Sequence, residues 1–150
     1  MQTFLPYDAF RKSAKVLDDK RLGKQRVEVC QILRTLRETS FGWTNHPAVK
    51  MWESHELALA KYGLFICYEW VRRGFKDKQA KTILEIVKMT EEALWDIWVP
   101  MPSWLGDEKF HSSHRAVLLA KNFEHYSQFG WTEKPAVTVD GRWPYVWPVN

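Results

Sequence analysis

Cysteine and long apolar runs are scarce in this sequence, and each shortage narrows the class of protein that it encodes. The 150 residues include two cysteines, Cys30 and Cys67, in no CxxC pair or other metal-type spacing. Both lie in apolar patterns of helical spacing, so we expect buried free thiols in a reducing compartment. The longest apolar stretch, residues 62–70, contains Glu69 and is far too short to cross a bilayer. No secretory signal opens the chain, so we expect a soluble, cytoplasmic protein without a membrane partner.

Size and composition are those of one folded domain spanning residues 1–150. Apolar residues make up 45% of the chain and charged residues 27%, with no repeat or linker, so a core can form without metal or disulfide. Aromatic residues are numerous, with nine Trp, five Tyr and eight Phe. Such rings fill cores, but they also stack on unpaired bases, so their number alone does not separate the two roles.

The positive charge is confined to the N-terminal end. The net charge is +4, and residues 1–40 hold nine Lys and Arg against five Asp and Glu, whereas the rest of the chain is balanced. A local basic face suits an anionic partner such as a phosphate backbone. A solvated helix face would show the same composition, so both interpretations stay open.

Apolar spacing predicts an all-α fold of about five helices with an irregular, aromatic-rich C-terminal strap. The expected helices cover residues 7–17, 19–37, 47–73 with a break near Ser54, 78–95, and 107–129. Asp18 or Asp19 can cap the second helix, Asp107 the fifth, and Gly74 and Gly130 can end the third and fifth. Residues 38–45 form a predicted loop, and Asp140–Gly141 a predicted turn within the strap.

The second predicted helix carries a polar stripe directly beside its apolar face. The stripe consists of Arg21, Lys24, Gln25 and Glu28. The apolar face consists of Leu22, Val29 and Leu33. Polar groups needed only for solubility would lie on the far side of the helix. One interpretation is a hydrogen-bonded brace of Arg21, Gln25 and Glu28. The other is a carboxylate among cations at a cleft, where it can position water or stabilise an oxocarbenium-like sugar.

Several segments resemble the pyrimidine-dimer DNA glycosylases of the phage endonuclease V group. The resemblance is closer to their short bacterial and phage relatives, which begin MQTFLPY and contain RLGKQRVE. The matching segments are Met1–Tyr7, Leu17–Glu28, Asn45–Trp52, Glu69–Gly74, Trp104–Arg115 and Tyr145–Pro148. The resemblance implies a compact all-α domain that extrudes a nucleotide of double-stranded DNA, cleaves its N-glycosidic bond and breaks the strand by β-elimination. It also implies the cytoplasm of a bacterial or phage-infected cell.

In that family the N-terminal α-amine is the nucleophile, and one glutamate on the second helix assists it. By resemblance the glutamate is Glu28, which follows the segment of Leu17, Asp19 and Leu22 at the equivalent distance. An α-amine, with a reference pKa of about 8, is partly neutral near neutral pH, unlike a lysine at about 10.4. The defined enzyme exposes a threonine amine, whereas here Gln2 is too large for the usual removal of Met1. Either the Met1 amine acts, or the imine chemistry has been lost; removal of Met1 would let Gln2 cyclise.

The histidines and tryptophans offer further candidates. His111 and His114 lie three residues apart after Asp107, but a metal site needs more ligands, so we expect no metal and no cofactor. The related FHxSHR pattern instead implies that these histidines face phosphate or Glu28. His46 is either a helix cap or a cleft residue, and His55 and His125 are treated as surface residues. Four tryptophans could build a stacking wall or belong to the core. They are Trp43, Trp52, Trp70 and Trp104.

These arguments favour a DNA glycosylase that excises a damaged or modified pyrimidine, with abasic-site lyase activity through the N-terminal amine, acting as a monomer. The candidate catalytic residues are Met1, Arg21, Gln25, Glu28, His111 and His114. The candidate DNA-binding residues are Lys20, Lys24, Arg26, His46 and Arg115. Two alternatives remain: a helical enzyme acting on a modified nucleotide or base, and a DNA-binding domain without catalysis in which Glu28 is only a brace.

Overall fold

The computed structural model describes residues 1–38, 42 and 44–148, and these residues form eight α-helices. The first four are α1 (Phe10–Val16), α2 (Asp19–Arg37), α3 (Pro47–Lys50) and α4 (Glu56–Arg72). The others are α5 (Gln79–Val87), α6 (Glu91–Asp96), α7 (Glu108–Lys121) and α8 (Phe123–Tyr126), followed by the 3₁₀ turn η1 (Ser127–Phe129). The described residues contain no strand beyond one isolated bridge, so the all-α prediction is confirmed.

The predicted number of helices is wrong because three of the expected helices are interrupted. Between α3 and α4, Ser54 has a φ of 66°, at the place where the sequence allowed a break. Lys88 ends α5 in the left-handed region with a φ of 57°, and the Thr90 side chain then caps α6. Asn122 caps α8 in the same way after α7 has ended. Side-chain caps therefore start new helices where apolar spacing alone continued the old one.

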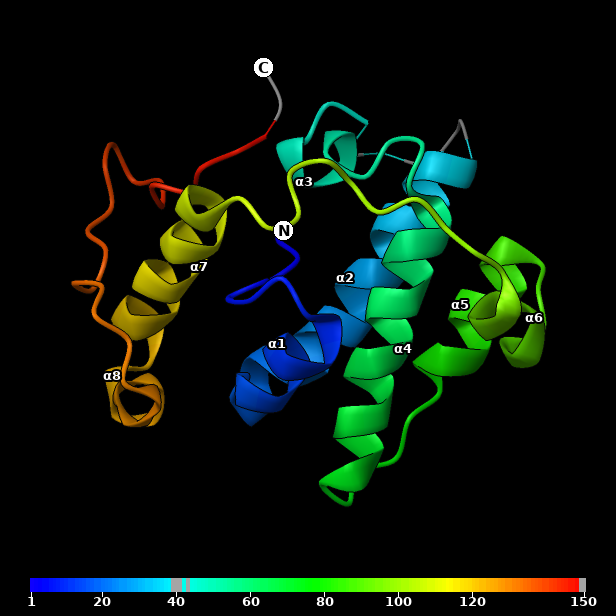
Figure 1. The fold of residues 1–150 in the computed structure, drawn as a ribbon, viewed down its shortest axis with the longest axis horizontal. Helices are drawn as coiled ribbons and strands as arrows, with labels where there is room; N and C mark the ends of the chain where they lie inside the picture. Colours follow the sequence, from blue (N-terminus) through cyan, green and yellow to red (C-terminus); the bar gives the residue numbers. More distant parts are fainter. Residues whose placement is uncertain (39–41, 43, 149–150) are drawn as a thin grey trace.

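The core lies where α2 packs against α4 and α5, with α1 on α4 (Figure 1). The expected apolar face of α2 is fully buried, since Leu22, Val29 and Leu33 are 0% exposed. Both cysteines are buried free thiols, as predicted. Among the described helices, none combines the length and the apolar character needed to cross a bilayer.

The C-terminal tail, residues 130–148, runs back along α7 toward the N-terminus of the chain (Figure 1). Its one regular feature is the predicted turn at Asp140 and Gly141, which have φ angles of 51° and 74°. Two successive positive φ angles are typical of a tight hairpin turn, here closed by Val139 and Arg142. The tail is attached to α7 in part by a hydrogen bond from the Val146 amide to the Ser113 hydroxyl.

The N-terminal segment, residues 1–5, is irregular but deeply buried, with Gln2 to Leu5 no more than 6% exposed. Because buried backbone groups must be paired, side chains take the place of a neighbouring strand. Gln25 accepts from the Phe4 amide (3.0 Å) and donates to the Gln2 carbonyl (2.8 Å). The Tyr62 hydroxyl donates to the Phe4 carbonyl (2.8 Å). These bonds from α2 and α4 hold the backbone of the segment at Gln2 and Phe4.

Helix α7 holds the same segment from the other side. His114 Nδ1 accepts from the Leu5 amide (2.9 Å), and His111 Nδ1 lies 2.8 Å from the Leu5 carbonyl oxygen. His111 Nε2 accepts from the Gly106 amide, so the proton of this ring is on Nδ1 and is donated to Leu5. Arg115 donates to the Pro6 carbonyl (2.7 Å). Both histidines therefore serve as anchors for the backbone of Leu5.

The stability of the fold should depend on the protonation of His114. Burial, followed by electrostatic interactions with His111 and Arg115, lowers the pKa of His114 from 6.5 to about 3. The unfolded chain then binds a proton near pH 5 that the folded chain does not. The free energy of unfolding is therefore highest above the pKa of the unfolded histidine, and it decreases as the pH falls below that value. We expect His114 to reduce the free energy of unfolding by about 2 kcal/mol between about pH 8 and pH 5.

Denaturant unfolding of the protein and of His114→Asn at several pH values tests this expectation. The Asn Oδ1 lies at the same bond distance from the backbone as Nδ1 and can accept from the Leu5 amide, but it does not titrate, so the variant should show a flatter dependence in this range. His46, whose pKa is also lowered, contributes in the same direction and leaves a residual slope. The carboxylates with lowered pKa values act only at lower pH. Equal slopes for both proteins would contradict a neutral His114 in the folded state.

Candidate active site

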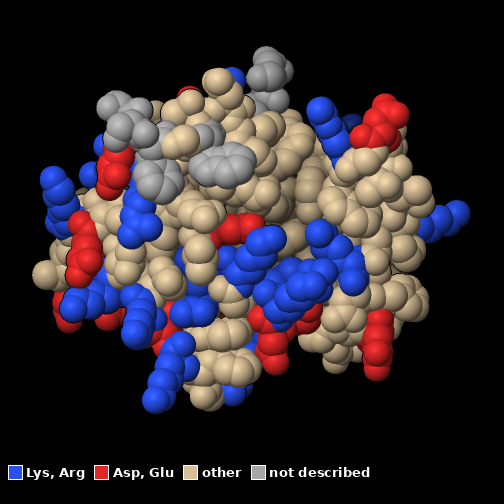
Figure 2. Space-filling model, turned by 180° about the vertical axis from the view of Figure 1, so that it is seen from behind, with Lys and Arg blue, Asp and Glu red and all other residues tan. Residues whose placement is uncertain are grey.

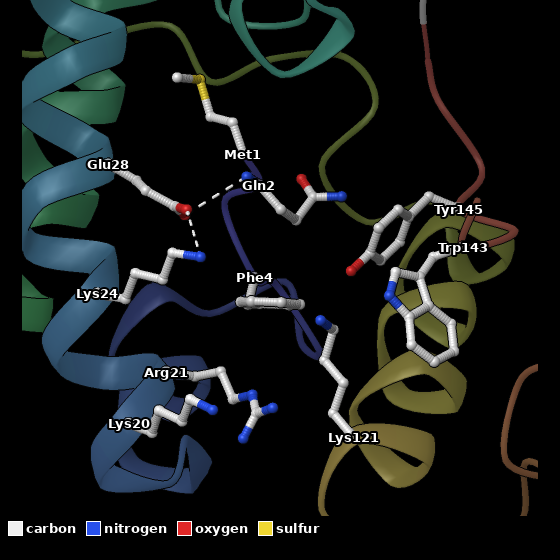
Figure 3. Close-up of a pocket in the computed structure, with 10 residues that line it drawn as sticks. All are labelled: Met1, Gln2, Phe4, Lys20, Arg21, Lys24, Glu28, Lys121, Trp143 and Tyr145. Carbon is white, nitrogen blue, oxygen red and sulfur yellow. Dashed lines mark hydrogen bonds and ion pairs between the residues drawn. The ribbon is translucent and has the colours of Figure 1, made fainter. Parts of the chain in front are cut away.

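A pocket of about 250 Å³, here called the Glu28 pocket, opens between α2, the N-terminal segment, the end of α7 and the tail. Figure 3 shows these four elements around one space, with the side chains of Glu28, Lys121 and Tyr145 directed toward it. The lining residues are Met1, Gln2, Phe4, Lys20, Arg21, Lys24, Glu28, Lys121, Trp143 and Tyr145. Cationic, aromatic and carboxylate side chains are therefore combined at one place.

Glu28 is the carboxylate of this pocket, and it is held in a fixed orientation. The residue is 6% exposed. Its Oε2 accepts from Gln25 Nε2 (2.9 Å) and from the Gln2 amide (3.4 Å), while Lys24 Nζ lies 3.7 Å from Oε1 (Figure 3). Oε2 is thus held by buried groups, whereas Oε1 faces the exposed Lys24. Helix α2 achieves this because Gln25 and Glu28 are one turn apart at the edge of its buried face.

Four cations surround the carboxylate. Lys20 and Lys24 are exposed, and Arg21 is held by Asp18, with 2.9 Å between Arg21 Nη1 and the Asp18 carboxylate. Lys121 comes from the last turn of α7, with its Nζ 5.2 Å from the centroid of the Trp143 ring. Figure 2 shows Lys and Arg side chains gathered across the middle of the face on which α2 lies. This arrangement attracts an anion while leaving one negative group among the cations.

Trp143 and Tyr145 form the aromatic wall of the pocket, together with Phe4. Tyr145 contacts Phe4 edge to face, with ring centroids 6.4 Å apart. Burial, and then the negative charge of Glu28, raise the pKa of the Tyr145 hydroxyl, so it remains a hydrogen-bond donor. Gln2 adds an amide nitrogen, Nε2, which has no hydrogen-bond partner among the described residues. Flat rings beside donors are what a nucleobase requires from a protein.

A second cavity of about 470 Å³ adjoins the Glu28 pocket and shares Met1, Trp143 and Tyr145 with it. Its other walls include His46 and Trp147, whose rings meet edge to face at 6.1 Å. Both sequence-based alternatives for His46 hold. It lines this cavity, and its Nδ1 accepts from the Ala48 amide and caps α3. Burial, and then the positive N-terminal amine, lower the pKa of His46. Met1 and His46 thus line the same cavity.

The structure brings together only part of the predicted catalytic set. Met1, Arg21 and Glu28 line the pocket. Gln25 lies beneath it, 0% exposed, and orients Glu28. His111 and His114 are not among the lining residues, because they bind the backbone of Leu5. The predicted brace is present between Gln25 and Glu28, but Arg21 binds Asp18 instead of joining it.

The predicted DNA-binding residues are also divided. Lys20 and Lys24 lie at the pocket, and His46 at the second cavity. Arg26 is paired with Asp77 at 2.8 Å, beneath the surface of α2. Arg115, 9% exposed, is bound by Glu108 and Glu133. Arg26 and Arg115 are therefore paired with carboxylates of the protein itself.

Among the predicted stacking residues, Trp52 is fully buried and Trp104 packs on the core, donating to the Met51 carbonyl. Trp70 stacks on Phe75, with ring centroids 4.1 Å apart, and Trp43 lies outside the described residues.

The residues that the sequence argument missed are Lys121 and Trp143. The end of an amphipathic helix and an irregular tail give no periodic signal; Tyr145 was marked only by the resemblance of its segment. Across the described residues, no group of three His, Cys, Asp or Glu is placed to hold a metal ion.

Comparison with known proteins connects this geometry to a family. No curated protein and no solved structure matches the chain. The family described as pyrimidine dimer DNA glycosylase matches residues 1–83, a span that contains the N-terminal segment, α2 and Glu28. Its members are DNA glycosylases, enzymes of DNA repair that act on DNA. Since this match covers more than half of its length, the chain belongs to the pyrimidine dimer DNA glycosylase family.

Proposed function

We propose that this protein excises a damaged or modified pyrimidine base from double-stranded DNA, with Glu28 as the catalytic carboxylate. The observation that carries the proposal is the fixed orientation of Glu28 in a pocket that otherwise presents cations and aromatic rings. A second carboxylate at the same place would repel the phosphates of the substrate.

Cleavage of an N-glycosidic bond passes through a sugar with oxocarbenium character, which a nearby carboxylate stabilises. Glu28 suits this role because Gln25 and the Gln2 amide already hold its Oε2 in place. Groups oriented before the reaction cost no reorganisation during it. The oxygen that faces Lys24 is then free to stabilise the sugar or to orient a water molecule.

The base must leave the duplex to enter a pocket of this size, as in other enzymes that act on bases. Trp143 and Tyr145 offer ring faces and edges, and the Tyr145 hydroxyl points into the pocket in Figure 3. Lys20, Lys24 and Arg21 would bind the flanking phosphates from the N-terminal half of α2. Contacts of this kind read charge and shape rather than sequence.

Strand cleavage after base release needs an amine that reacts with the abasic sugar. The family resemblance indicates the N-terminal amine, and Met1 does line the pocket. The abasic-site lyase step is therefore part of the proposal, and it uses the same space as base excision.

The substitution Glu28→Gln tests the catalytic role. The amide oxygen can accept the bonds from Gln25 and Gln2, and only the ion pair with exposed Lys24 is lost, so folding and DNA affinity should change little. Single-turnover base release from irradiated DNA should fall by at least ~100-fold. The matched control is Glu38→Gln, an exposed glutamate at the end of the same helix, which should behave as wild type.

Turnover and melting temperatures of the same samples together separate catalysis from bracing. If Glu28 only braces the helix, Glu28→Gln keeps both accepted hydrogen bonds, and its folded fraction should show normal turnover at an unchanged melting temperature. That result would remove Glu28 from the mechanism.

We expect DNA affinity to fall steeply as salt increases, because Lys20 and Lys24 are exposed at the pocket. Neutralising Lys20 and Lys24 together, as the Lys20→Gln, Lys24→Gln double variant, should reduce the slope of log K against log salt by about 1.8, because each lost phosphate contact contributes about 0.9. The control neutralises Lys81 and Lys88, exposed residues on and after α5 that do not line the pocket. Titrations by fluorescence anisotropy at several salt concentrations give the slopes. Identical slopes for the wild type and the Lys20, Lys24 variant would place the DNA elsewhere.

A further inference from the structure

The side-chain amide of Gln2 is hydrogen-bonded at one end and not at the other. Gln2 is 4% exposed, so this amide is removed from bulk water. Its Oε1 accepts from the Thr3 backbone amide at 2.9 Å. Its Nε2 is buried and has no hydrogen-bond partner among the residues that the structure describes. Because an unpaired buried donor is costly, this nitrogen needs a partner from outside the chain, which is either water or a ligand.

The backbone of Thr3 determines which way the Gln2 amide is turned. The oxygen and the nitrogen of a glutamine can exchange places by rotation of the terminal group. The Thr3 amide is a donor, so the atom that faces it is the oxygen. Rotation would place two donors against each other and break this bond. The nitrogen therefore points away from Thr3, and it can donate but cannot accept.

Nε2 is directed into the Glu28 pocket. Gln2 lines this pocket, and in Figure 3 its side chain runs from the backbone beside Glu28 toward Tyr145. The backbone is held on both sides of its Cα, since the Gln2 amide donates to Glu28 (3.4 Å) and the Gln2 carbonyl accepts from Gln25 (2.8 Å). The pocket thus contains a donor with a fixed position relative to its carboxylate.

The polar groups of the pocket favour a ligand that presents acceptors. Glu28 is the one carboxylate among the lining residues that the structure describes, and the Tyr145 hydroxyl can donate or accept. A carbonyl oxygen beside Nε2 would replace water as its partner, whereas an amino group would meet a second donor and lose its own bonds to water. The other polar side chains of the lining are cations, which only donate: Lys20, Arg21, Lys24 and Lys121.

The position of Glu28 decides which group of a pyrimidine reaches Nε2. In a pyrimidine nucleotide the oxygen at C2 is next to N1, which carries the sugar, and the group at C4 lies across the ring. The sugar must lie at Glu28 for the carboxylate to act on it. The Gln2 side chain leads away from Glu28 (Figure 3), so Nε2 faces the far side of the ring. The group at C4 is a carbonyl oxygen in thymine and uracil and an amino group in cytosine.

We propose that Gln2 determines specificity: its Nε2 donates to the C4 carbonyl oxygen of the pyrimidine in the Glu28 pocket and selects thymine-type and uracil-type bases against cytosine-type bases. This inference rests on the proposed function only in taking a pyrimidine as the ligand of this pocket. Gln2 has no part in the cleavage of the bond, so its effect is on the affinity for the base.

Nuclear magnetic resonance can follow the Gln2 amide group directly. The ¹⁵N-labelled protein is titrated with thymidine 5′-monophosphate or with 5-methyldeoxycytidine 5′-monophosphate, which share the sugar, the phosphate and the methyl group but differ at C4. We expect the side-chain amide signals of Gln2 to shift with the thymidine nucleotide, which should bind roughly 10-fold more tightly. Equal affinities, a preference for the cytidine nucleotide, or Gln2 signals that do not move with the thymidine nucleotide would overturn the proposal.

The substitution Gln2→Met keeps the length of the side chain but removes the donor. The two signals that its spectrum lacks are those of the Gln2 amide, which assigns them, and the variant should bind both nucleotides with nearly equal affinity. Its melting temperature is measured because the Thr3 amide loses an acceptor, and the wild-type titration stands without it. Gln31→Met, on α2 outside the pocket lining, is the control and should keep the wild-type preference. A folded Gln2→Met protein with that preference would contradict the role of Gln2.

Free nucleotides make this test independent of base excision. Base release from irradiated DNA, measured with the same proteins, reports separately on the glycosylase. Release without a nucleotide preference would remove Gln2 from recognition and leave the proposed function intact. A preference that depends on Gln2, without release, would keep the recognition of the base and contradict the catalytic proposal.

Discussion

A buried stretch of backbone without a partner strand constrains the whole of this structure. The N-terminal segment can lie in the core only if side chains pair its amides and carbonyls. Gln25 satisfies this need most completely, because its amide oxygen accepts from the Phe4 amide while its nitrogen donates to the Gln2 carbonyl and to Glu28. A glutamate at this position would lose both donated bonds, so the amide is required. The same residue thus fixes the chain terminus and aims the carboxylate.

This coupling explains how a carboxylate is tolerated so close to the core. Burial of a lone negative charge is costly, but Glu28 receives two hydrogen bonds from the buried side and faces cations on the open side. The cations, in turn, remain close together because Asp18 neutralises Arg21, and Tyr126 and Asn122 hold Asp18. Structure and reactivity at this site therefore depend on the same bonds.

The sequence predicted those parts of the fold that have local causes. Helix α2 has the predicted bounds because its apolar spacing continues between them, although its N-cap residue Asp18 makes no side-chain capping bond and binds Arg21 instead. Glu28 was identified from its place beside that apolar face. The division of the later helices was missed because Thr90 and Asn122 act as caps within apolar spacing that continues past them. Lys121 and Trp143 were missed because an irregular tail and the last turn of a distant helix carry no local signal of where they meet. His111 and His114 were recognised as a polar pair, but only the fold shows that they hold the backbone of Leu5.

The anchoring of the N-terminal segment also has a consequence for synthesis on the ribosome. Leu5 and Pro6 are synthesised long before their partners in α7, which are His111, His114 and Arg115. Until then Leu5 and Pro6 lack acceptors and donors from α7, and the nascent terminus has no complete binding place. The reactive centre is therefore assembled late, when α7 docks, and a chain released prematurely after α6 would carry Glu28 without the wall that completes its pocket.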